Sequence, residues 1–360
     1  MSRPAVPLDT FEHSLRRDVS LRSLTTLELG GPARYLIEAA DEATLIRAVL
    51  WAAEQGLPLV VLGGGSNVVV SDAGFDGLVV RMAIRGTAFR DDGTVYAAAG
   101  EAWDPFVEAT VARGWAGIEC LAGIPGSVGA TPIQNVGAYG QEVAETIRDV
   151  RVLDRAARAI VTLSAAQCTF GYRDSVFRRN PGAYVVLGVA FALRPGGPPS
   201  VRYRELSDAL AADPPPSLAT VSATVRALRR KKSMVIDPSD PNRRSVGSFF
   251  TNPVLDAAAF AALAARATAA GVVTTPSDVP CHAAPDGKVK VPAAWLIERA
   301  GFTKGLRRGP VGISSAHALS LVHHGGGTTA ALRALAEEIR AAVDARFGVT
   351  LTEEPITLGR

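Results

Sequence analysis

Apolar and polar positions along the chain alternate in an order typical of mixed α/β proteins. The strand-like run Arg34–Ala39 is followed by apolar residues at helical spacing, and Asp41 stands where it can cap that helix. A short apolar run, Leu59–Leu62, and a further run over residues 77–82 come next. The pattern therefore predicts a strand–helix–strand unit at the start of the chain.

The middle of the chain is richer in strand patterns. A strand is expected over 94–99 and a helix from Asp104 to Gly114, and three further strands are expected over 150–153, 159–163 and 184–193. The connections between the last three are short, which favours an antiparallel or mixed sheet. Proline clusters at 195–199 and 213–216 predict a domain boundary near residues 195–225.

The C-terminal third returns to a mixed pattern. It predicts helices over 217–232, 255–270, 293–300 and 328–347, and strands over 318–322 and 350–358. A chain of 360 residues with 48% hydrophobic residues can bury a core, and its length predicts two or three domains.

Composition narrows the class of protein. The formal net charge of +3 is too small for the strongly basic face of a nucleic-acid-binding protein. Three well-separated cysteines exclude a disulfide scaffold and suit a reducing compartment. The segment Met1–Ser20 carries charges and has no apolar core, so no secretion signal is expected. The uncharged run Cys120–Gln141 is too rich in glycine and proline to form a membrane-spanning helix. We expect a cytoplasmic protein without membrane insertion.

The first candidate site is Gly63-Gly64-Gly65-Ser66-Asn67, directly after the strand Leu59–Leu62. Successive glycines let backbone N–H groups approach an oxyanion closely, and Ser66 and Asn67 add side-chain donors. The segment predicts a phosphate or pyrophosphate cradle. The alternative is an ordinary tight connection between two strands.

The second candidate covers residues 123–130 and 134–140, where glycines and small residues occur with almost no charge. Such a segment suits backbone packed against a flat ligand. Two glycine-rich turns about 60 residues apart could hold the two ends of one dinucleotide.

A third glycine run, Gly325-Gly326-Gly327-Thr328-Thr329-Ala330, satisfies the dinucleotide-binding pattern G-x-G-x-x-A between a strand and a helix. At most one strand remains after it, so no doubly wound sheet can follow. We interpret it as a strand-to-helix turn.

Two further segments carry polar chemistry. Five cationic residues lie within Arg226–Lys232. Arg229 and Lys232 share one helical face, on which they could bind an anion. The alternative is that these residues form a solvated last turn that complements the helix dipole. Ser248 lies in Gly247-Ser248-Phe249-Phe250 without the G-x-S-x-G pattern of hydrolases. None of the five histidines has the spacing of metal ligands, so no metal is expected.

These segments, in this order, resemble the UDP-N-acetylenolpyruvoylglucosamine reductase family. The matching segments are TTLELGGPARYL (25–36), LGGGSNVVVSD (62–72), GIPGSVGATPIQNVGAYGQE (123–142), YRDSVF (172–177), GSFFTNP (247–253), DGKVKVPAAWLIERAGF (286–302) and LTEEP (351–355). They span nearly the whole chain.

The resemblance implies an α+β and α/β fold: a two-subdomain FAD-binding fold of the vanillyl-alcohol-oxidase type plus a C-terminal α/β substrate domain. The implied divisions are 1–83 and 84–224 for the FAD-binding subdomains, 225–348 for the substrate domain, and 349–360 for a strand that returns to the first subdomain. It also implies noncovalent FAD, NADPH as co-substrate, a UDP-sugar substrate, no nucleic-acid partner and a monomer.

The resemblance also implies catalytic positions. Arg173 matches the family arginine, Ser248 the serine that donates a proton, and Glu354 the acid, with Glu353 as the competing choice. In the implied reaction, hydride from NADPH passes through the flavin to the enolpyruvyl double bond. Arg173 and a protonated Glu354 would stabilise the charge that develops on the neighbouring carboxylate.

The implied FAD-binding residues are Leu62, Gly63, Gly64, Gly65, Ser66, Asn67, Ile124, Pro125, Gly126, Ser127, Gly129, Ala130, Ile133, Gly137 and Tyr139. The implied substrate-binding residues are Tyr203, Arg229, Lys232, Asn252 and His317. The chain departs from the family in the loop before Asp286, where Pro280-Cys281-His282 replaces a substrate-contacting tyrosine of some members, and at His317, where some members have glutamine.

Two other functions compete with this hypothesis. One is an FAD oxidoreductase of the same fold that acts on sugar lactones or alcohols, and GSFFTNP and LTEEP argue against it. The other is a noncatalytic UDP-sugar-binding protein, which would not need Arg173, Ser248 and Glu354 together.

Overall fold

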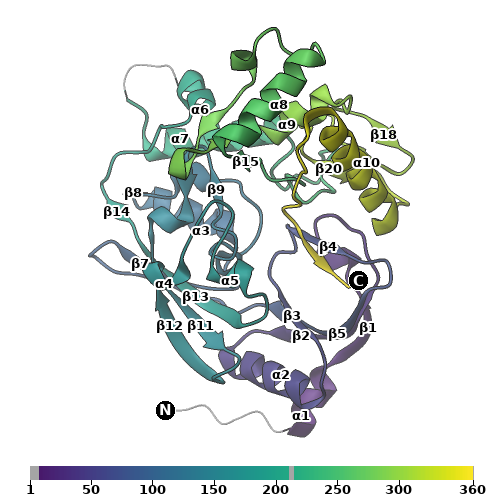
Figure 1. The fold of residues 1–360 in the computed structure, drawn as a ribbon. Coiled ribbons are helices and arrows are strands. Elements are labelled where there is room, and N and C mark those ends of the chain that lie inside the picture. Colours follow the sequence, from purple (N-terminus) through teal and green to yellow (C-terminus); the bar gives the residue numbers. More distant parts are fainter. Residues whose placement is uncertain (1–7, 211–214, 360) are drawn as a thin grey trace. The chain divides into compact units, whose positions relative to one another are not determined.

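Two α/β units, each with its own apolar core, are built from interleaved stretches of the chain. The computed structural model describes residues 8–210 and 215–359 (Figure 1). The first unit comprises the residues up to Ser20, Pro32–Gly65 and Phe75–Ile236; the second comprises Leu21–Gly31, Ser66–Gly74 and the residues from Asp237 on. Residues 1–7, in the segment for which no secretion signal is expected, and residues 211–214, in the predicted boundary region 195–225, lie outside the described residues.

The first unit begins with the predicted strand–helix–strand pattern. Its four-stranded sheet has the order β1 (Arg16–Ser20), β2 (Pro32–Ala39), β5 (Phe75–Met82) and β3 (Leu59–Leu62). Strands β2, β5 and β3 run parallel, and β1 is antiparallel to β2. The helix α2 (Glu42–Glu54) packs on β2 and β5 (Figure 1). Asp41 caps it as predicted, since its carboxylate accepts a hydrogen bond from Thr44 N at 2.8 Å.

A five-stranded sheet follows in the same unit, and it is antiparallel as its short connections predicted. Its order is β12 (Ala159–Ser164), β11 (Ile147–Asp154), β13 (Tyr184–Ala192), β7 (Thr94–Ala98) and β6 (Thr87–Phe89). The helices α3 (Trp103–Ala112) and α7 (Leu218–Lys231) pack together beside the turn Glu119–Leu121.

Short elements complete the first unit. They are α1 (Leu8–Ser14), β8 (Trp115–Ala116), β9 (Gly137–Ala138), β10 (Gln141–Glu142), α4 (Ala165–Cys168), α5 (Val176–Arg179), β14 (Arg194–Pro195), α6 (Arg204–Ala209) and the 3₁₀ turns Val128–Ala130 and Val143–Glu145.

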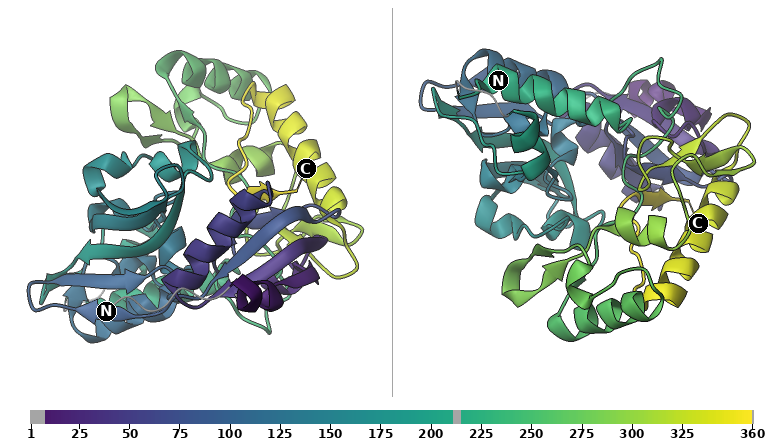
Figure 2. Two further views of the ribbon diagram at one scale, coloured as in Figure 1. Left: turned by 90° about the horizontal axis from the view of Figure 1, so that it is seen from below. Right: turned by 90° about the horizontal axis from the view of Figure 1, so that it is seen from above.

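The second unit is organised around α10 (Thr329–Phe347), which packs against α8 (Ala257–Ala269), α9 (Ala293–Arg299), β19 (Val311–Ile313) and β20 (Leu321–His323) (Figure 2). Its apolar face supplies Leu332, Leu335, Ile339, Val343 and Phe347 to the core at helical spacing. The remaining elements are β4 (Val68–Val70), β15 (Val254–Leu255), β16 (His282–Ala283), β17 (Val289–Lys290), β18 (Arg307–Arg308), β21 (Ile356–Leu358) and the 3₁₀ turns Arg22–Leu24, Pro276–Asp278 and Pro285–Gly287.

The start of α10 explains the third glycine run. The Asp72 carboxylate accepts hydrogen bonds from Thr329 N and Ala330 N, both at 2.8 Å, and so occupies the positive end of the helix. Gly327 N donates to His323 Nε2 at 3.0 Å in the turn itself. The run is a strand-to-helix turn, as predicted.

Several predicted boundaries differ from the structure, and three of the differences have a physical reason. The strand expected over 350–358 covers only Ile356–Leu358, because Pro355 has no N–H to continue a ladder. The strand expected over 318–322 is Leu321–His323, because Ser320 N is turned back to the His317 carbonyl oxygen. The division expected at 224/225 falls inside α7, whose apolar side chains belong to the core of the first unit.

The C-terminal strand β21 pairs in parallel with β4. Residues 68–70 lie in the segment expected to form the first FAD-binding subdomain, yet the structure places them in the second unit with the C-terminus. The division of the first unit into two subdomains at 83/84 remains a prediction.

Candidate active site

In the first unit, the two predicted glycine-rich blocks lie against each other. A Cβ on Gly64 would stand 2.9 Å from Gly126 Cα, and a Cβ on Gly63 would stand 2.3 Å from Ser127 Oγ. The contact at Gly64 is with backbone, so the approach of the two loops requires glycine there, whereas at Gly63 the Ser127 hydroxyl would have to move. Gly64 is exposed and Gly126 half-buried, which leaves this backbone accessible to a ligand.

The second block is fixed to the elements around it by backbone hydrogen bonds. Val128 N donates to Glu101 O and Gly129 N to Ala99 O. Asp104, the second residue of α3, accepts from Gly123 N at 2.5 Å and from Arg226 Nη2 of α7 at 2.8 Å. The loop is therefore preorganised. Its bare, rigid backbone next to Gly63–Gly65 fits a flat dinucleotide such as FAD.

Arg173 projects from a tight turn that closes on the same block. Its φ of +53° is left-handed, and Gly171 and Asp174 exchange backbone hydrogen bonds across the turn. Its guanidinium donates to the carbonyl oxygens of Asn135 and Gly137 at 3.3 and 2.8 Å. The predicted catalytic arginine is thus held at the edge of the predicted flavin loop.

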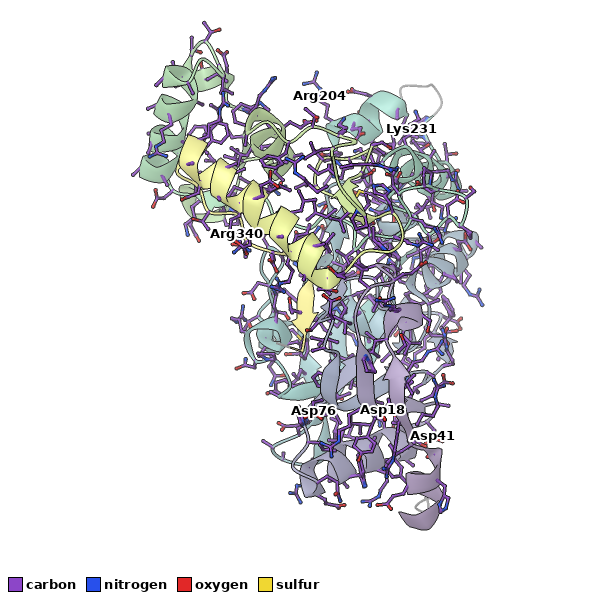
Figure 3. The ribbon with its side chains drawn as sticks, turned by 90° about the vertical axis from the view of Figure 1, so that its right-hand side faces the viewer. Asp18, Asp41, Asp76, Arg204, Lys231 and Arg340 are labelled. Carbon is purple, nitrogen blue, oxygen red and sulfur yellow. The ribbon has the colours of Figure 1, made fainter. Side chains whose placement is uncertain are left out.

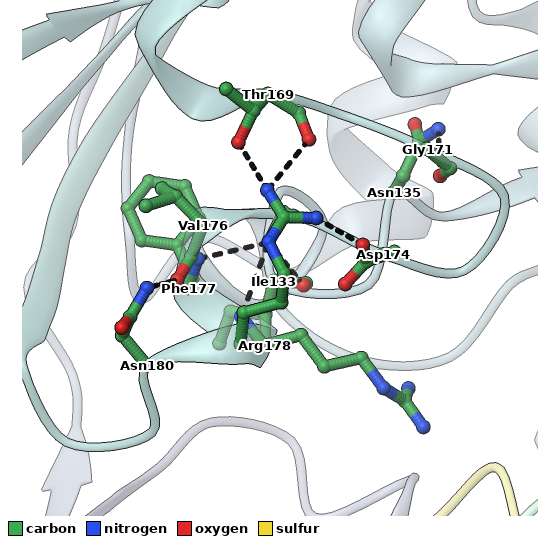
Figure 4. A network of polar contacts seen from close by, with 11 residues as sticks. Ile133, Asn135, Thr169, Gly171, Asp174, Val176, Phe177, Arg178 and Asn180 are labelled. Atoms are coloured by element: carbon green, nitrogen blue, oxygen red, sulfur yellow. Dashed lines mark hydrogen bonds and ion pairs between the residues drawn. The ribbon is translucent and has the colours of Figure 1, made fainter.

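The remainder of this turn is held by the polar network in Figure 4. Ser175 Oγ donates to Ile133 O at 2.5 Å and caps α5 by accepting from Phe177 N and Arg178 N. Arg179 binds the Asp174 carboxylate and the Thr169 carbonyl oxygen. This support explains how a non-glycine residue keeps a left-handed conformation at position 173.

A cation cluster lies at the end of α7 in the same unit. Arg229 is only 7% exposed, its Nη2 donates to Met234 O at 2.7 Å, and its Nε is buried with no hydrogen-bond partner among the described residues. Burial lowers the pKa of Arg229 to about 10, and the Arg173 charge acts in the same direction. An anion bound here would compensate a charge that the protein leaves largely desolvated.

Two tyrosines and a second cation adjoin Arg229. The rings of Tyr139 and Tyr203 meet edge to face, with centroids 5.5 Å apart, and Lys232 Nζ lies 5.7 Å from the Tyr139 ring centroid. Burial raises the pKa of Tyr139 to about 12, so it stays a neutral donor. Lys232 also bonds Glu205 of α6 at 2.5 Å. The sequence had not singled out Glu205.

In the second unit, the segments of Ser248 and Glu354 run side by side. Glu354 N donates to Phe249 O at 2.9 Å, and Thr251 N donates to Thr352 O at 2.9 Å. Phe249 and Phe250 are buried, which anchors the backbone on the C-terminal side of Ser248. Asn67 joins the same group, because its Nδ2 contacts Glu354 O at 3.5 Å and its carbonyl accepts from Ile356 N.

The two candidate acids have different surroundings. The Glu353 carboxylate contacts Arg340 Nη2 at 2.9 Å and Arg333 Nη2 at 3.7 Å, both on α10. A carboxylate that contacts two guanidinium groups is directed to that helix. Because this contact engages the Glu353 carboxylate, it favours Glu354 over Glu353 as the candidate catalytic acid.

The two remaining predicted substrate contacts also belong to the second unit. Asn252 Oδ1 accepts from Ala293 N at 2.8 Å, the first residue of α9, so this side chain also anchors a helix. His317 accepts a hydrogen bond from Ser320 N at its carbonyl oxygen. His282 and Cys281 are exposed.

The structure adds polar residues that the sequence analysis missed. Asp104 connects the second glycine-rich block to α7, and Asp72 accepts hydrogen bonds at the start of α10. Asp104 had been noted only as a helix start, and Asp72 lay within a matched segment without a role. Among the described residues, no helix has the length and apolarity to span a membrane, and no three potential metal-ligating side chains gather.

Comparisons with known proteins identify the class. Residues 33–164 match the family model of an FAD binding domain, and residues 238–358 match that of the UDP-N-acetylenolpyruvoylglucosamine reductase C-terminal domain. The chain is therefore an FAD-dependent oxidoreductase, and its fold class is the predicted one: a mixed α/β FAD-binding domain followed by a C-terminal domain.

Relatives over the full length identify the family. The UDP-N-acetylenolpyruvoylglucosamine reductase of Streptomyces coelicolor is 50% identical over 99% of this chain and 93% of the relative, and that of Thermobifida fusca is 49% identical over 96% and 98%. The crystal structure of the Thermus caldophilus reductase superimposes with a TM-score of 0.64 at 25% identity, covering 96% of this chain and all of the other. This chain belongs to the UDP-N-acetylenolpyruvoylglucosamine reductase family, as its motifs indicated.

The cofactor is expected to be bound without a covalent link. Cys120, the cysteine nearest the second glycine block, is buried with Sγ 3.0 Å from Ser200 O, and burial raises the pKa of its thiol to about 12. Acid precipitation of the purified protein should therefore release all of the flavin into the supernatant. Flavin absorbance that stays with the pellet after washing would contradict the prediction.

Proposed function

We propose that this chain reduces UDP-N-acetylglucosamine enolpyruvate to UDP-N-acetylmuramate in peptidoglycan synthesis, with Ser248, Glu354 and Arg173 as its catalytic residues. One observation carries the assignment of residues: the hydrogen bond from Glu354 N to Phe249 O at 2.9 Å places Glu354 beside the Ser248 segment. This backbone contact supports the proposal, because it brings the segments of the proposed proton donor and the proposed acid together in the second unit.

When bound, FAD would supply the redox chemistry, which is hydride transfer from NADPH to the enolpyruvyl double bond. The residues of Gly63–Gly65 and the loop from Gly123 to Gly129 would hold it, since both present close, bare backbone. Ser66 and Asn67 are assigned to FAD binding as well.

Ser248 holds the proton that the substrate must gain. When a hydride adds to the terminal carbon, the neighbouring carbon becomes carbanion-like and requires a general acid. A hydroxyl is a weak acid, but a positioned donor within hydrogen-bond reach still contributes on the order of 10²–10⁴-fold to rate.

Arg173 and Glu354 act on the substrate carboxylate. Negative charge accumulates on that group during hydride addition, and a guanidinium and a protonated carboxylic acid both stabilise it. The carbonyl oxygens of Asn135 and Gly137 hold the Arg173 guanidinium before substrate arrives. Such preorganisation lowers the cost of charge stabilisation in the transition state.

Arg229 and Lys232 bind the anionic part of the UDP-sugar, with Tyr203 beside them. Asn252 and His317 are also assigned to substrate binding. The buried Nε of Arg229 supports this assignment, because a desolvated cation gains most from an anionic ligand. Lys232 would exchange its contact with Glu205 for the ligand.

A two-stage experiment tests the function. Purified protein should be yellow, should be bleached by NADPH under anaerobic conditions, and should regain its colour when UDP-N-acetylglucosamine enolpyruvate is added. Mass spectrometry should then find UDP-N-acetylmuramate. Reoxidation by sugar lactones or alcohols instead would indicate a different oxidoreductase, and no response to NADPH would indicate a noncatalytic binder.

We further infer that the enzyme works as a monomer in the cytoplasm, without a nucleic-acid partner. All three cysteines are free, which suits a reducing compartment. The formal charge of +3 gives no basic face for nucleic acid.

A further inference from the structure

Two arginines of α10 hold the C-terminal segment that carries the proposed acid. Arg340 Nη2 lies 2.9 Å from Glu353 Oε1, and Arg333 Nη2 lies 3.7 Å from Glu353 Oε2. Arg333 Nη1 also donates to Thr357 Oγ1 at 3.0 Å. Seven positions apart, the two arginines lie on one face of the helix, two turns from each other. Figure 3 shows Arg340 on α10.

The ion pair between Arg340 and Glu353 is better shielded from water than the other ion pairs of α10. The Glu353 and Arg340 side chains are 17% and 28% exposed, whereas Arg308 and Glu338 are 47% and 44% exposed. Partial burial strengthens an ion pair, because water screens it less. The helix is itself fixed, by its buried apolar face and by Asp72 at its N-terminus.

The ladder of backbone hydrogen bonds is interrupted at this point. Phe250 and Glu353 form an isolated bridge, and Glu354 N donates to Phe249 O. Pro355 has no N–H, so the next bond of the segment comes only at Ile356 N. The side-chain contacts from α10 therefore supply a restraint that the backbone lacks between these two bonds.

Successive side chains of an extended segment point to opposite sides. Because the Glu353 carboxylate is held against α10, Glu354 is directed away from that helix. We propose that Arg340, assisted by Arg333, is a positioning residue: by fixing Glu353 it orients Glu354 at the Ser248 site. This inference rests on the proposed function, in which Glu354 is the acid.

The test separates the two half-reactions of the holoenzyme. Arg340→Gln should slow substrate-driven flavin reoxidation at saturating substrate by about 10-fold or more, within the roughly 10²-fold that a misplacement of about 1 Å can cost. Flavin reduction by NADPH and the apparent substrate affinity should stay within about two-fold. Arg340→Lys should recover most of the loss, because an ammonium group can still pair with Glu353.

A double-mutant cycle checks that the effect passes through Glu353. Glu353→Gln should slow reoxidation as Arg340→Gln does, and the double variant should be no slower than either single one. Arg308→Gln, which breaks the exposed pair with Glu338 on the same helix, is the matched control and should change neither half-reaction. Additive losses would overturn the proposal.

Two further outcomes would overturn it. In the first, the flavin of Arg340→Gln is reoxidised as fast as that of Arg308→Gln. In the second, Arg340→Gln loses both half-reactions and its unfolding temperature falls, which indicates a structural role only. Glu354→Ala is measured alongside: normal reoxidation in this variant overturns the acid assignment and the positioning role with it. If reoxidation is slow in Glu354→Ala but normal in Arg340→Gln, the acid assignment stands and only the positioning role of Arg340 is overturned.

Discussion

Replacing Ser248 with alanine should slow reoxidation of the reduced flavin by substrate about 10²-fold or more, while NADPH reduces the flavin at a near wild-type rate. The variant removes the proposed proton donor and leaves the backbone contacts around it in place. Phe249 N still donates to Leu319 O, and Phe249 and Phe250 still fill the core of the second unit. Stopped-flow absorbance of the flavin measures each half-reaction separately.

Ser248→Cys provides the conservative comparison, because a thiol keeps a proton at nearly the same position. It should retain more reoxidation activity than Ser248→Ala. An equal loss in both half-reactions of the alanine variant would move Ser248 from proton transfer to structure.

Replacing Arg229 with methionine should weaken substrate binding by roughly 10²-fold or more, the scale for removing one member of a buried charge pair. The ligand-free protein should lose little or no thermal stability. Burial lowers the pKa of Arg229 to about 10, so the folded protein disfavours the charge, and an apolar side chain of similar length relieves that cost. Substrate titration of the oxidised flavin spectrum, with thermal unfolding in parallel, measures both effects.

Arg230→Met is the matched control, since Arg230 lies next to Arg229 on α7 but is exposed. It should bind substrate normally. Unchanged affinity in Arg229→Met would place the anion elsewhere, and unfolding of that variant without ligand would show that the guanidinium is structural through its bond to Met234 O.

Periodicity predicted the long elements well, because their burial is set by local pattern. The face of α10 that carries Leu332 and Ile339, and the cap of α2 at Asp41, could both be predicted from the order of residues. The pairing of the short parallel strands β4 and β21 could not be predicted in this way. Its partners are distant in sequence, and three-residue strands carry no period of their own.

The site shows the same division. Glycine density singled out the two loops that lie against each other at Gly64 and Gly126, because close approach of two backbones demands the absence of a Cβ. It could not predict that Arg173 has a left-handed backbone supported by Ser175 and Asn135, since that depends on tertiary hydrogen bonds. Nor could it separate Glu353 from Glu354, because the contact of Glu353 with Arg340 of α10, which favours Glu354 as the proposed acid, joins side chains from different elements.

The pairing of β4 with β21 has a consequence for biosynthesis. Asn67 and Glu354 are in contact although they stand 287 positions apart, and the second unit takes stretches from both ends of the chain. A ribosome must release nearly the entire polypeptide before this unit can close, and contacts of such high sequence separation form slowly. Until then Val68–Val70 has no strand to pair with, so the nascent chain exposes an apolar edge that chaperones would recognise.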